Sequence, residues 1–242
     1  MAAVNDVATT GSAKSSAEIR WRRDRLFFTG MALAGAVAIF VGFAPSYYLK
    51  AVYGTPALPP LVHLHGVLFT SWITLLVVQT SLIAFRRTDW HRRLGVGGGV
   101  LAAAMTIVGL ATAIGSIRRG SSDLGFLVVP MGSVVVFPAL VGAALLLRRK
   151  TGAHKRLMLI ATTELLTAGV GGWPMIQTWG PLGFFGATDL FVVALVIYDL
   201  MTRGRIHAAT FWGGLFFIVS QPLRMSIAGT QAWLTFARWL TG

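Results

Sequence analysis

Long apolar stretches separated by short polar segments run along most of this chain. Seven of these stretches have roughly the length of about 20 residues at which a helix crosses the hydrocarbon core of a bilayer. They cover residues 26–44, 61–85, 94–117, 124–147, 157–173, 184–201 and 206–220. The pattern predicts an all-α, polytopic membrane protein in which seven transmembrane helices form a bundle.

The two ends of the chain have a different character from its middle. Residues 1–25 are polar and poor in bulky apolar side chains, which predicts a disordered basic tail. Near the other end, Trp233 and Trp239 recur with further apolar residues at helical spacing, which indicates an amphipathic helix in the membrane interface. The expected organisation is a tail, a transmembrane domain over 26–224 and an interfacial segment over 225–242.

Basic residues alternate between the gaps that separate the apolar stretches. One set of gaps contains most of the 21 Lys and Arg residues, and the opposite set contains only Lys50, Arg118, Arg119, Arg224 and Arg238. An excess of Lys and Arg marks the cytoplasmic side of a membrane protein. This positive-inside pattern places the N-terminus inside and the C-terminus outside.

The composition fits a membrane protein and narrows its partners. The chain is 55% hydrophobic and only 12% charged, whereas a soluble domain contains about 25% charged residues. A net charge of +13 would suggest nucleic acid in a soluble protein, but these basic residues flank apolar spans, where anionic lipid headgroups attract them. We therefore expect a bilayer with anionic headgroups as the partner and no nucleic acid. The absence of cysteine excludes disulfides, iron–sulfur clusters and thiolate zinc sites.

Three histidines share one depth near the predicted cytoplasmic face. His91, His154 and His207 each open an outward-running helix. Histidines at equal depth on separate helices can ligate a haem iron from two sides, or bind another metal. In that case the propionates would be neutralised by the neighbouring Arg92, Arg93 and Arg156. Alternatively, the three histidines are headgroup-level residues within basic clusters.

Two polar residues lie deeper in the spans. Gln79 precedes Arg86 by seven residues and Glu164 follows Arg156 by eight, so both are roughly 10–12 Å inward from the cytoplasmic charges. Glu164 is interpreted as the only acid well inside a span. Polar groups inside a membrane are costly, so the pair is either a proton-carrying or ligand-binding site or a hydrogen bond between helices.

A third group of polar residues is expected near the outer face: His63, His65, Gln177, Asp189, Gln221 and Arg224. His63 and His65 are two residues apart on a helix and cannot both face one site. The helices that carry Asp189 and Arg224 are expected to be antiparallel neighbours, so these two residues can form an ion pair. The alternative is that each complements the dipole of its own helix end.

Four short motifs connect the chain to known proteins: His-Leu-His-Gly at 63–66, Trp-His-Arg-Arg-Leu-Gly at 90–95, His-Lys-Arg-Leu-Met at 154–158, and Trp-Gly-Gly-Leu followed by Ser-Gln-Pro-Leu-Arg within 212–224. Over about residues 26–240 the chain resembles a group of uncharacterised bacterial multi-pass membrane proteins. The resemblance implies a bacterial inner-membrane location and no established activity. The inner His-basic pattern is similar, more loosely, to haem-b electron-transfer membrane families, which implies haem b as a cofactor.

Three functions are compatible with these residues. The first is a small redox protein associated with haem or quinone, with His91 and His154 as axial ligands. In this case Glu164 and Gln79 would handle a proton or a quinone oxygen. No catalytic residue follows from the sequence, which leaves open whether the protein is an enzyme.

The second function is a proton-coupled transporter of small molecules. Its site would include Glu164 and Gln79, and kinks at Pro130 and Pro138 would permit movement. The third is a non-catalytic accessory or assembly subunit, in which the glycine-rich stretch 95–99 packs against a membrane partner or a second copy.

Overall fold

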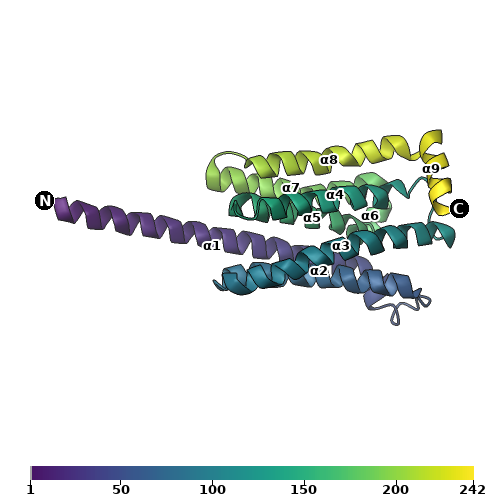
Figure 1. Cartoon of the computed structure of the whole chain (residues 1–242), viewed down its shortest axis with the longest axis horizontal. Coiled ribbons are helices and arrows are strands. Elements are labelled where there is room, and N and C mark those ends of the chain that lie inside the picture. Colours follow the sequence, from purple (N-terminus) through teal and green to yellow (C-terminus); the bar gives the residue numbers. More distant parts are fainter. Residues whose placement is uncertain (1) are drawn as a thin grey trace.

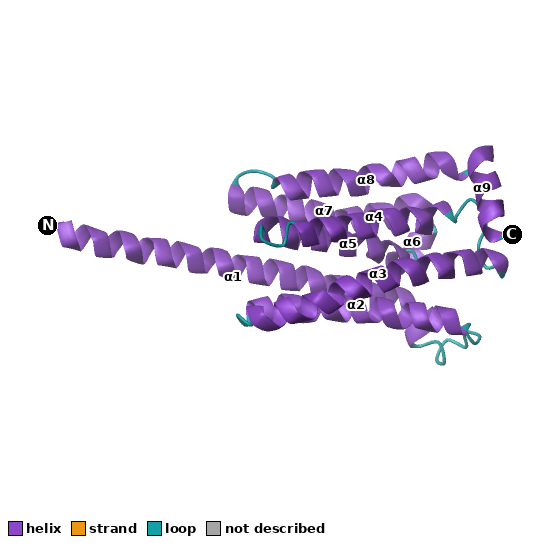
Figure 2. Cartoon of the chain, viewed as in Figure 1, coloured by secondary structure: helices purple, strands orange, loops and turns teal. Residues whose placement is uncertain are grey.

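The computed structural model describes residues 2–242, with the side chains of residues 18, 19 and 21–242. Throughout this part of the chain every regular element is a helix, and short loops join the helices (Figure 2). In chain order they are α1 (Ala2–Phe43), the π-helical turn η1 (Ala44–Tyr48), α2 (Pro60–Ala84), α3 (Thr88–Arg118), α4 (Val128–Leu146), α5 (Thr151–Val170), α6 (Pro174–Gln177), α7 (Gly180–Arg203), α8 (Ala208–Ala228) and α9 (Gln231–Thr241). The all-α prediction is therefore confirmed.

Five of the helices are long and apolar enough to cross a membrane. They are α2, α3, α4, α7 and the part of α1 that continues through η1, Trp21–Tyr48. Helices α5 and α8 coincide with two further predicted spans but are less apolar than the other five. The protein is thus a candidate multi-pass membrane protein, and the number of seven spans stays a prediction.

Helix α5 lies at the centre of the bundle. It packs against α1, α4, α7 and α8, and thirteen of its twenty residues are buried. The α2–α3 hairpin lies beside α1 and α4, and α9 crosses the end of the bundle against α3 and α8 (Figure 1). A helix surrounded by protein can carry polar side chains that a lipid-facing helix cannot, which explains the lower hydropathy of α5.

The N-terminal helix differs from the expected tail. Residues 1–25 were predicted to be disordered, whereas the backbone of α1 is helical from Ala2 and extends beyond one end of the bundle (Figure 1). Two side chains of this stretch contact the bundle. The guanidinium of Arg86 lies 4.5 Å from the centre of the Trp21 ring, and the carboxylate of Asp24 pairs with Lys155. These contacts join the start of the first apolar stretch to the loops at the same end.

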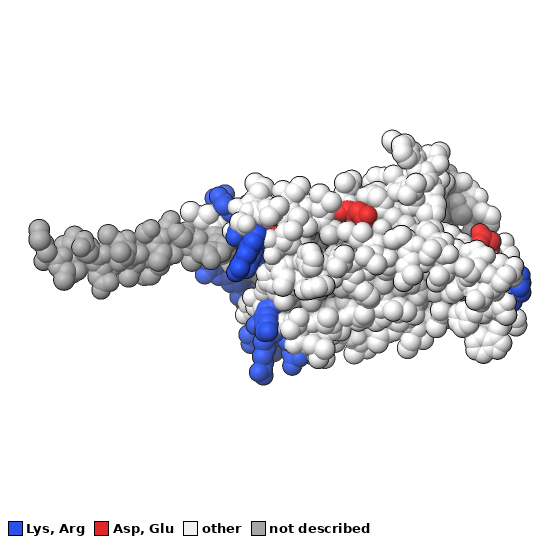
Figure 3. Space-filling view, turned by 90° about the horizontal axis from the view of Figure 1, so that it is seen from above, with Lys and Arg blue, Asp and Glu red and all other residues white. Residues whose placement is uncertain are grey.

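Basic side chains gather at that end of the bundle. Figure 3 shows Lys and Arg clustered where α1 leaves the bundle, while most of the visible face between the two ends is free of charge. The helix order accounts for this, because the α2–α3, α4–α5 and α7–α8 connections carry the basic motifs and lie at one end (Figure 1). Which side of a membrane this end faces stays a prediction.

Two helices contain an internal proline. Pro138 lies inside α4 and Pro222 inside α8, whereas Pro130 is the third residue of α4. A proline in the first turn is compatible with a regular helix, but an internal one removes a backbone hydrogen bond. Of the two predicted kink positions, only Pro138 therefore interrupts a helix, and Pro222 was not predicted.

Helices α1 and α5 approach each other closely at a pair of glycines. A Cβ atom added to Gly42 would lie 1.8 Å from the carbonyl oxygen of Gly169, and one added to Gly169 would lie 2.7 Å from Ile39 Cδ1. No side chain fits between the two backbones at this crossing. Small residues of this kind allow close packing of helices within a membrane.

We predict that Gly42→Ala lowers stability by about 1–3 kcal/mol, because the added methyl group forces α1 away from α5. Gly30→Ala is the matched control on the same helix, since a Cβ at Gly30 meets no atom within 4 Å. Thermal unfolding of the purified protein in detergent measures both variants. Equal midpoints for the two would contradict the close crossing.

Candidate functional site

A cavity of about 620 Å³ lies between the α2–α3 hairpin and helices α4, α5 and α7. Most of its wall is apolar and includes Phe69, Met105, Phe126, Phe137 and Phe184. Its polar lining includes His65, Thr106, Thr112, Ser116, Ser133, Glu164, Thr167 and Gln177. An apolar cavity with a few converging polar groups is the usual form of a small-molecule site.

One polar residue of the cavity wall, Glu164, belongs to a buried ion pair. Glu164 on α5 and Arg224 on α8 are both almost fully buried, and Glu164 Oε1 lies 2.9 Å from Arg224 Nη1. The hydroxyl of Ser133 on α4 donates to the same carboxylate oxygen at 2.6 Å. Three helices are thus tied together at one carboxylate, in a setting where an unpaired charge would be very costly.

Three buried polar atoms around this pair have no hydrogen-bond partner among the described residues: Glu164 Oε2, Thr167 Oγ1 and Arg224 Nε. Buried polar atoms are normally hydrogen-bonded, so such exceptions indicate a site where another molecule completes the contacts. Glu164 and Thr167 are three residues apart on α5 and both line the cavity, which places their free oxygens on the same helix face.

Gly132 on α4 provides the space for the buried arginine. A Cβ atom at this position would lie 2.0 Å from Arg224 Nε and 2.6 Å from Arg224 Cζ. Both contacts are far shorter than van der Waals distance. The glycine therefore allows the guanidinium to lie between α4 and α5 and reach Glu164.

The expected partners in the outer group are different from those in the structure. Arg224 was predicted to follow its helix and either to pair with Asp189 or to complement the dipole of its helix end, but α8 continues to Ala228 and turns Arg224 inward to Glu164. Asp189 instead accepts a hydrogen bond from Gln221 Nε2 at 2.7 Å. Gln221 and Arg224 are three residues apart, so one helix supplies a partner to each of the two acids.

Of the remaining outer and mid-depth residues, some line the cavity and others do not. His65 lines it, whereas His63 is exposed, in agreement with their predicted opposite directions. Gly66 does not leave room for a ligand, because a Cβ there would lie 2.4 Å from the Tyr47 ring. Gln79 does not line the cavity and is not a partner of Glu164, so the predicted mid-depth pair is not formed.

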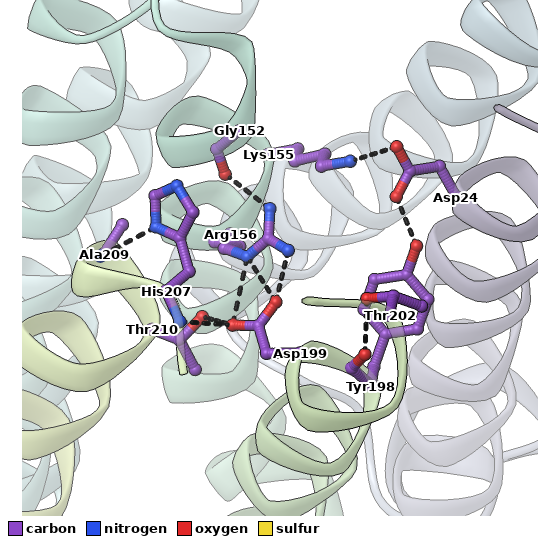
Figure 4. Close-up of polar contacts among 10 residues, drawn as sticks. All are labelled: Asp24, Gly152, Lys155, Arg156, Tyr198, Asp199, Thr202, His207, Ala209 and Thr210. Atoms are coloured by element: carbon purple, nitrogen blue, oxygen red, sulfur yellow. Dashed lines mark hydrogen bonds and ion pairs between the residues drawn. The ribbon is translucent and has the colours of Figure 1, made fainter. Parts of the chain in front are cut away.

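A second buried polar cluster lies at the basic end of the bundle (Figure 4). The guanidinium of Arg156 on α5 forms an ion pair with the carboxylate of Asp199 on α7, and the exposed fraction of each side chain is 2% or less. Arg156 Nε donates to Asp199 Oδ1 at 2.9 Å, and Nη1 donates to the Gly152 carbonyl at 2.9 Å. Asp199 Oδ2 also accepts from the Thr210 hydroxyl at 2.6 Å and from the His207 backbone N–H at 3.1 Å. Both charges are therefore compensated, and α5, α7 and α8 are joined.

A more exposed set of contacts attaches α1 to this cluster. Lys155 Nζ lies 2.6 Å from Asp24 Oδ2, and the hydroxyl of Tyr198 donates to the other oxygen of the same carboxylate (Figure 4). The ring of Phe27 stacks on Tyr198 with the ring centres 4.0 Å apart. These contacts fix α1 against α5 and α7 at the end where it leaves the bundle.

Sequence reasoning missed Asp199. Glu164 was interpreted as the only acid well inside a span, but Asp199 lies within the apolar stretch 184–201 and its side chain is fully buried. Its position near the end of that stretch gave it the appearance of a headgroup-level residue. The signal that could have identified it is the arginine at the same depth on a neighbouring helix, Arg156.

The three inner histidines separate into a pair and a single residue. The rings of His91 and His154 lie edge to face, with their planes at 87° and their centres 6.2 Å apart. His154 Nδ1 lies 2.9 Å from the Ala144 carbonyl oxygen, and His91 Nδ1 is buried without a partner among the described residues. His207 instead caps α8, where its Nδ1 accepts from the Ala209 N–H at 3.0 Å. Burial, and then the nearby Arg156 cation, lower the pKa of His207, which favours the neutral ring that this cap requires.

One residue of the predicted haem arrangement has other partners in the structure. Arg156 was expected to neutralise a propionate, but its guanidinium is occupied by Asp199 and Gly152. Neither His91 nor His154 lines the cavity. Across the described side chains, no group of three or more His, Cys, Asp or Glu residues is placed to hold a metal ion. The haem assignment stays a prediction, and no step of the function proposed below involves it.

Comparisons with protein-family models, with curated proteins and with solved structures found no match for this chain. Functional inference therefore depends on the two buried polar clusters and on the cavity beside one of them.

We predict that Asp199→Asn destabilises the protein by about 3–5 kcal/mol, because it leaves the Arg156 cation buried without a counter-charge. Lys155→Gln breaks the partly exposed pair with Asp24 and should cost at most about 1 kcal/mol. Unfolding of both variants in detergent would be compared with the wild type. A small loss for Asp199→Asn would show that the buried charge is compensated in another way.

We also predict that Gly132→Ala disrupts the Glu164–Arg224 pair, because the new methyl group occupies the space of the guanidinium. The expected loss of stability is about 1–3 kcal/mol. Gly142→Ala on the same helix meets no atom within 4 Å and should have no such effect. A wild-type unfolding midpoint for Gly132→Ala would contradict the placement of Arg224.

Proposed function

We propose that this protein is a seven-span protein of the bacterial cytoplasmic membrane that binds a small, mainly apolar molecule and couples its transport to proton movement. The observation that carries the proposal is the buried Glu164–Arg224 pair, whose carboxylate residue lies in the wall of a large apolar cavity and keeps one oxygen without a partner among the described residues. A carboxylate in such a position can bind both a proton and a ligand.

The proposed span number is supported by the lengths and positions of α5 and α8. They contain 20 and 21 residues, and a helix of 20 residues measures about 30 Å, the thickness of the hydrocarbon core. Three of their four charged residues, Arg156, Glu164 and Arg224, are buried within the bundle, and the fourth, Lys155, lies partly exposed at the basic end. The concentration of basic side chains at one end supports placing the N-terminus inside and the C-terminus outside.

Proton coupling would operate through the ion pair. When Glu164 is ionised, it holds Arg224 and Ser133, and with them α8 and α4. Protonation of Glu164 would remove the negative charge and leave the arginine cation buried without compensation, which favours a rearrangement of α8. Pro222 is two residues from Arg224 and Pro138 is five from Ser133, so each helix lacks a backbone hydrogen bond close to the pair. Binding, protonation and helix movement are thereby linked at one carboxylate.

We predict that Glu164→Gln abolishes proton-coupled transport, since glutamine retains the shape and loses the titratable group. Because it also leaves the Arg224 cation buried without a counter-charge, the variant should be less stable than the wild type, and transport is compared at equal amounts of folded protein. The purified protein would be placed in liposomes that contain a pH-sensitive dye, and small apolar alcohols, phenols, amines and carboxylic acids would be added outside. At least one class should change the internal pH more than in protein-free liposomes. This difference should fall about tenfold or more in Glu164→Gln.

Glu18→Gln is the matched control, because it makes the same chemical change at an exposed position of α1. It should transport like the wild type. Two results would contradict the proposal: no class changes the internal pH through the wild-type protein, or Glu164→Gln remains as active as Glu18→Gln.

A further inference from the structure

We propose that the ligand of the cavity is a neutral aromatic molecule with a hydroxyl group, bound with its hydroxyl at Glu164 Oε2 and Thr167 Oγ1. This inference rests on the proposed function and specifies the class of molecule that the same site takes. It follows from the charge balance of the site, from the hydrogen-bonding capacity of its free atoms and from the side chains of its walls.

The charge balance favours a neutral ligand. Among the described side chains, Glu164 is the only acid that lines the cavity, and Arg224 already compensates it at 2.9 Å. Within the same set, no lysine or arginine lines the cavity itself. A charged ligand would therefore lose its hydration without gaining a counter-charge, and that penalty is large in a low-dielectric interior.

The free atoms favour a ligand that donates a hydrogen bond. An ionised carboxylate only accepts hydrogen bonds, and Glu164 Oε1 already accepts from Ser133 and pairs with Arg224. Oε2 is buried and has no donor among the described residues, and Thr167 Oγ1, also without a partner, lies one helical turn away. A ligand hydroxyl can donate to Oε2 while it accepts from the Thr167 hydroxyl. This arrangement would satisfy both atoms, one of them through a strong charge-assisted bond.

The walls favour an aromatic body. Phe69, Phe126, Phe137 and Phe184 line the cavity together with Met105, and the His65 ring lies 5.7 Å from that of Phe69. Aromatic side chains bind a flat ring through offset or edge-to-face contacts, and methionine adds a sulfur–aromatic contact. The volume of about 620 Å³ lies within the range for small-molecule pockets, roughly 300–1,000 Å³.

The same residues indicate the direction of access. The cavity extends from Glu164 along α5 to Gly171 and Gly172, and it includes the exposed residues Phe126 and Gln177. These residues lie at the end of the bundle opposite the basic loops, because α5 begins at Thr151 in the basic end and runs away from it. The hydroxyl of a ligand that enters from this end would reach Glu164, the innermost residue of α5 in the cavity wall.

The test uses three probes with the same ring system and the full-length protein in detergent. The probes are 2-naphthol, its methyl ether, which has no donor, and 2-naphthoate, which is an anion at neutral pH. Binding is measured by titration calorimetry against protein-free micelles. We expect 2-naphthol to bind about ten- to a hundredfold more tightly than the ether, which is the ratio for one hydrogen bond to a charged group. 2-Naphthoate should bind no better than the ether.

Two variants locate the hydroxyl. Thr167→Val and Glu164→Gln should each weaken 2-naphthol binding and leave the affinity for the ether unchanged, so the ether also reports that the cavity is intact. Thr80→Val is the matched control, because the Thr80 hydroxyl bonds to its own helix backbone and Thr80 does not line the cavity. It should bind all three probes like the wild type.

The outcomes separate this inference from the proposed transport function. Equal binding of 2-naphthol and the ether by the wild-type protein, or tighter binding of 2-naphthoate, overturns the ligand class. A preference for 2-naphthol that both variants retain overturns its placement at Glu164 and Thr167. Selective binding of 2-naphthol without any proton movement in liposomes upholds the ligand class and overturns transport. Proton movement driven only by another class of molecule upholds transport and overturns the ligand class.

Discussion

The need to compensate buried charge governs this structure. Helix α5 carries Arg156 and Glu164 in the centre of a bundle whose outer surface is apolar. Neither side chain can reach water, so each requires an opposite charge from a neighbouring helix. Asp199 of α7 supplies the counter-charge for Arg156, and Arg224 of α8 supplies it for Glu164. These two pairs determine which helices surround α5, and they specify its rotation and its position along the bundle axis more strictly than apolar packing can.

The two pairs differ in how completely they are satisfied, and this difference gives each a separate role. Asp199 accepts from Arg156, Thr210 and the His207 backbone, which leaves neither of its oxygens free. A cluster that is fully hydrogen-bonded in this way joins the helices and stabilises their arrangement. Glu164 keeps one oxygen without a donor beside a large cavity. A half-satisfied carboxylate is costly to maintain, and its persistence next to an open apolar space is the main physical argument for a ligand at this end of the bundle.

Glycine positions make both arrangements possible. At Gly42 and Gly169 the absence of side chains lets the backbones of α1 and α5 touch, and at Gly132 it lets the guanidinium of Arg224 enter between α4 and α5. The glycine-rich start of α3 is different. A Cβ atom added to Gly98 would lie 3.1 Å from Leu75 Cδ2 of α2, whereas one added to Gly97 would meet no atom within 4 Å. That face therefore packs only partly within the chain, and the predicted contact with a membrane partner remains untested.

The sequence alone determined the all-helical class, the approximate positions of the long helices and the gathering of basic residues at alternate loops. These properties depend on local hydrophobicity and on the order of the helices along the chain, and both can be read directly from the sequence. It also identified Glu164 as a significant group. Only the tertiary structure decided that Arg224 pairs with Glu164 and not with Asp189, that Asp199 is buried against Arg156, and that Gln79 is apart from the cavity. Those pairings depend on the rotation of each helix about its axis and on where it ends. For α8, an end at Ala228 beyond the predicted 220 turned Arg224 from a surface residue into the partner of a buried acid.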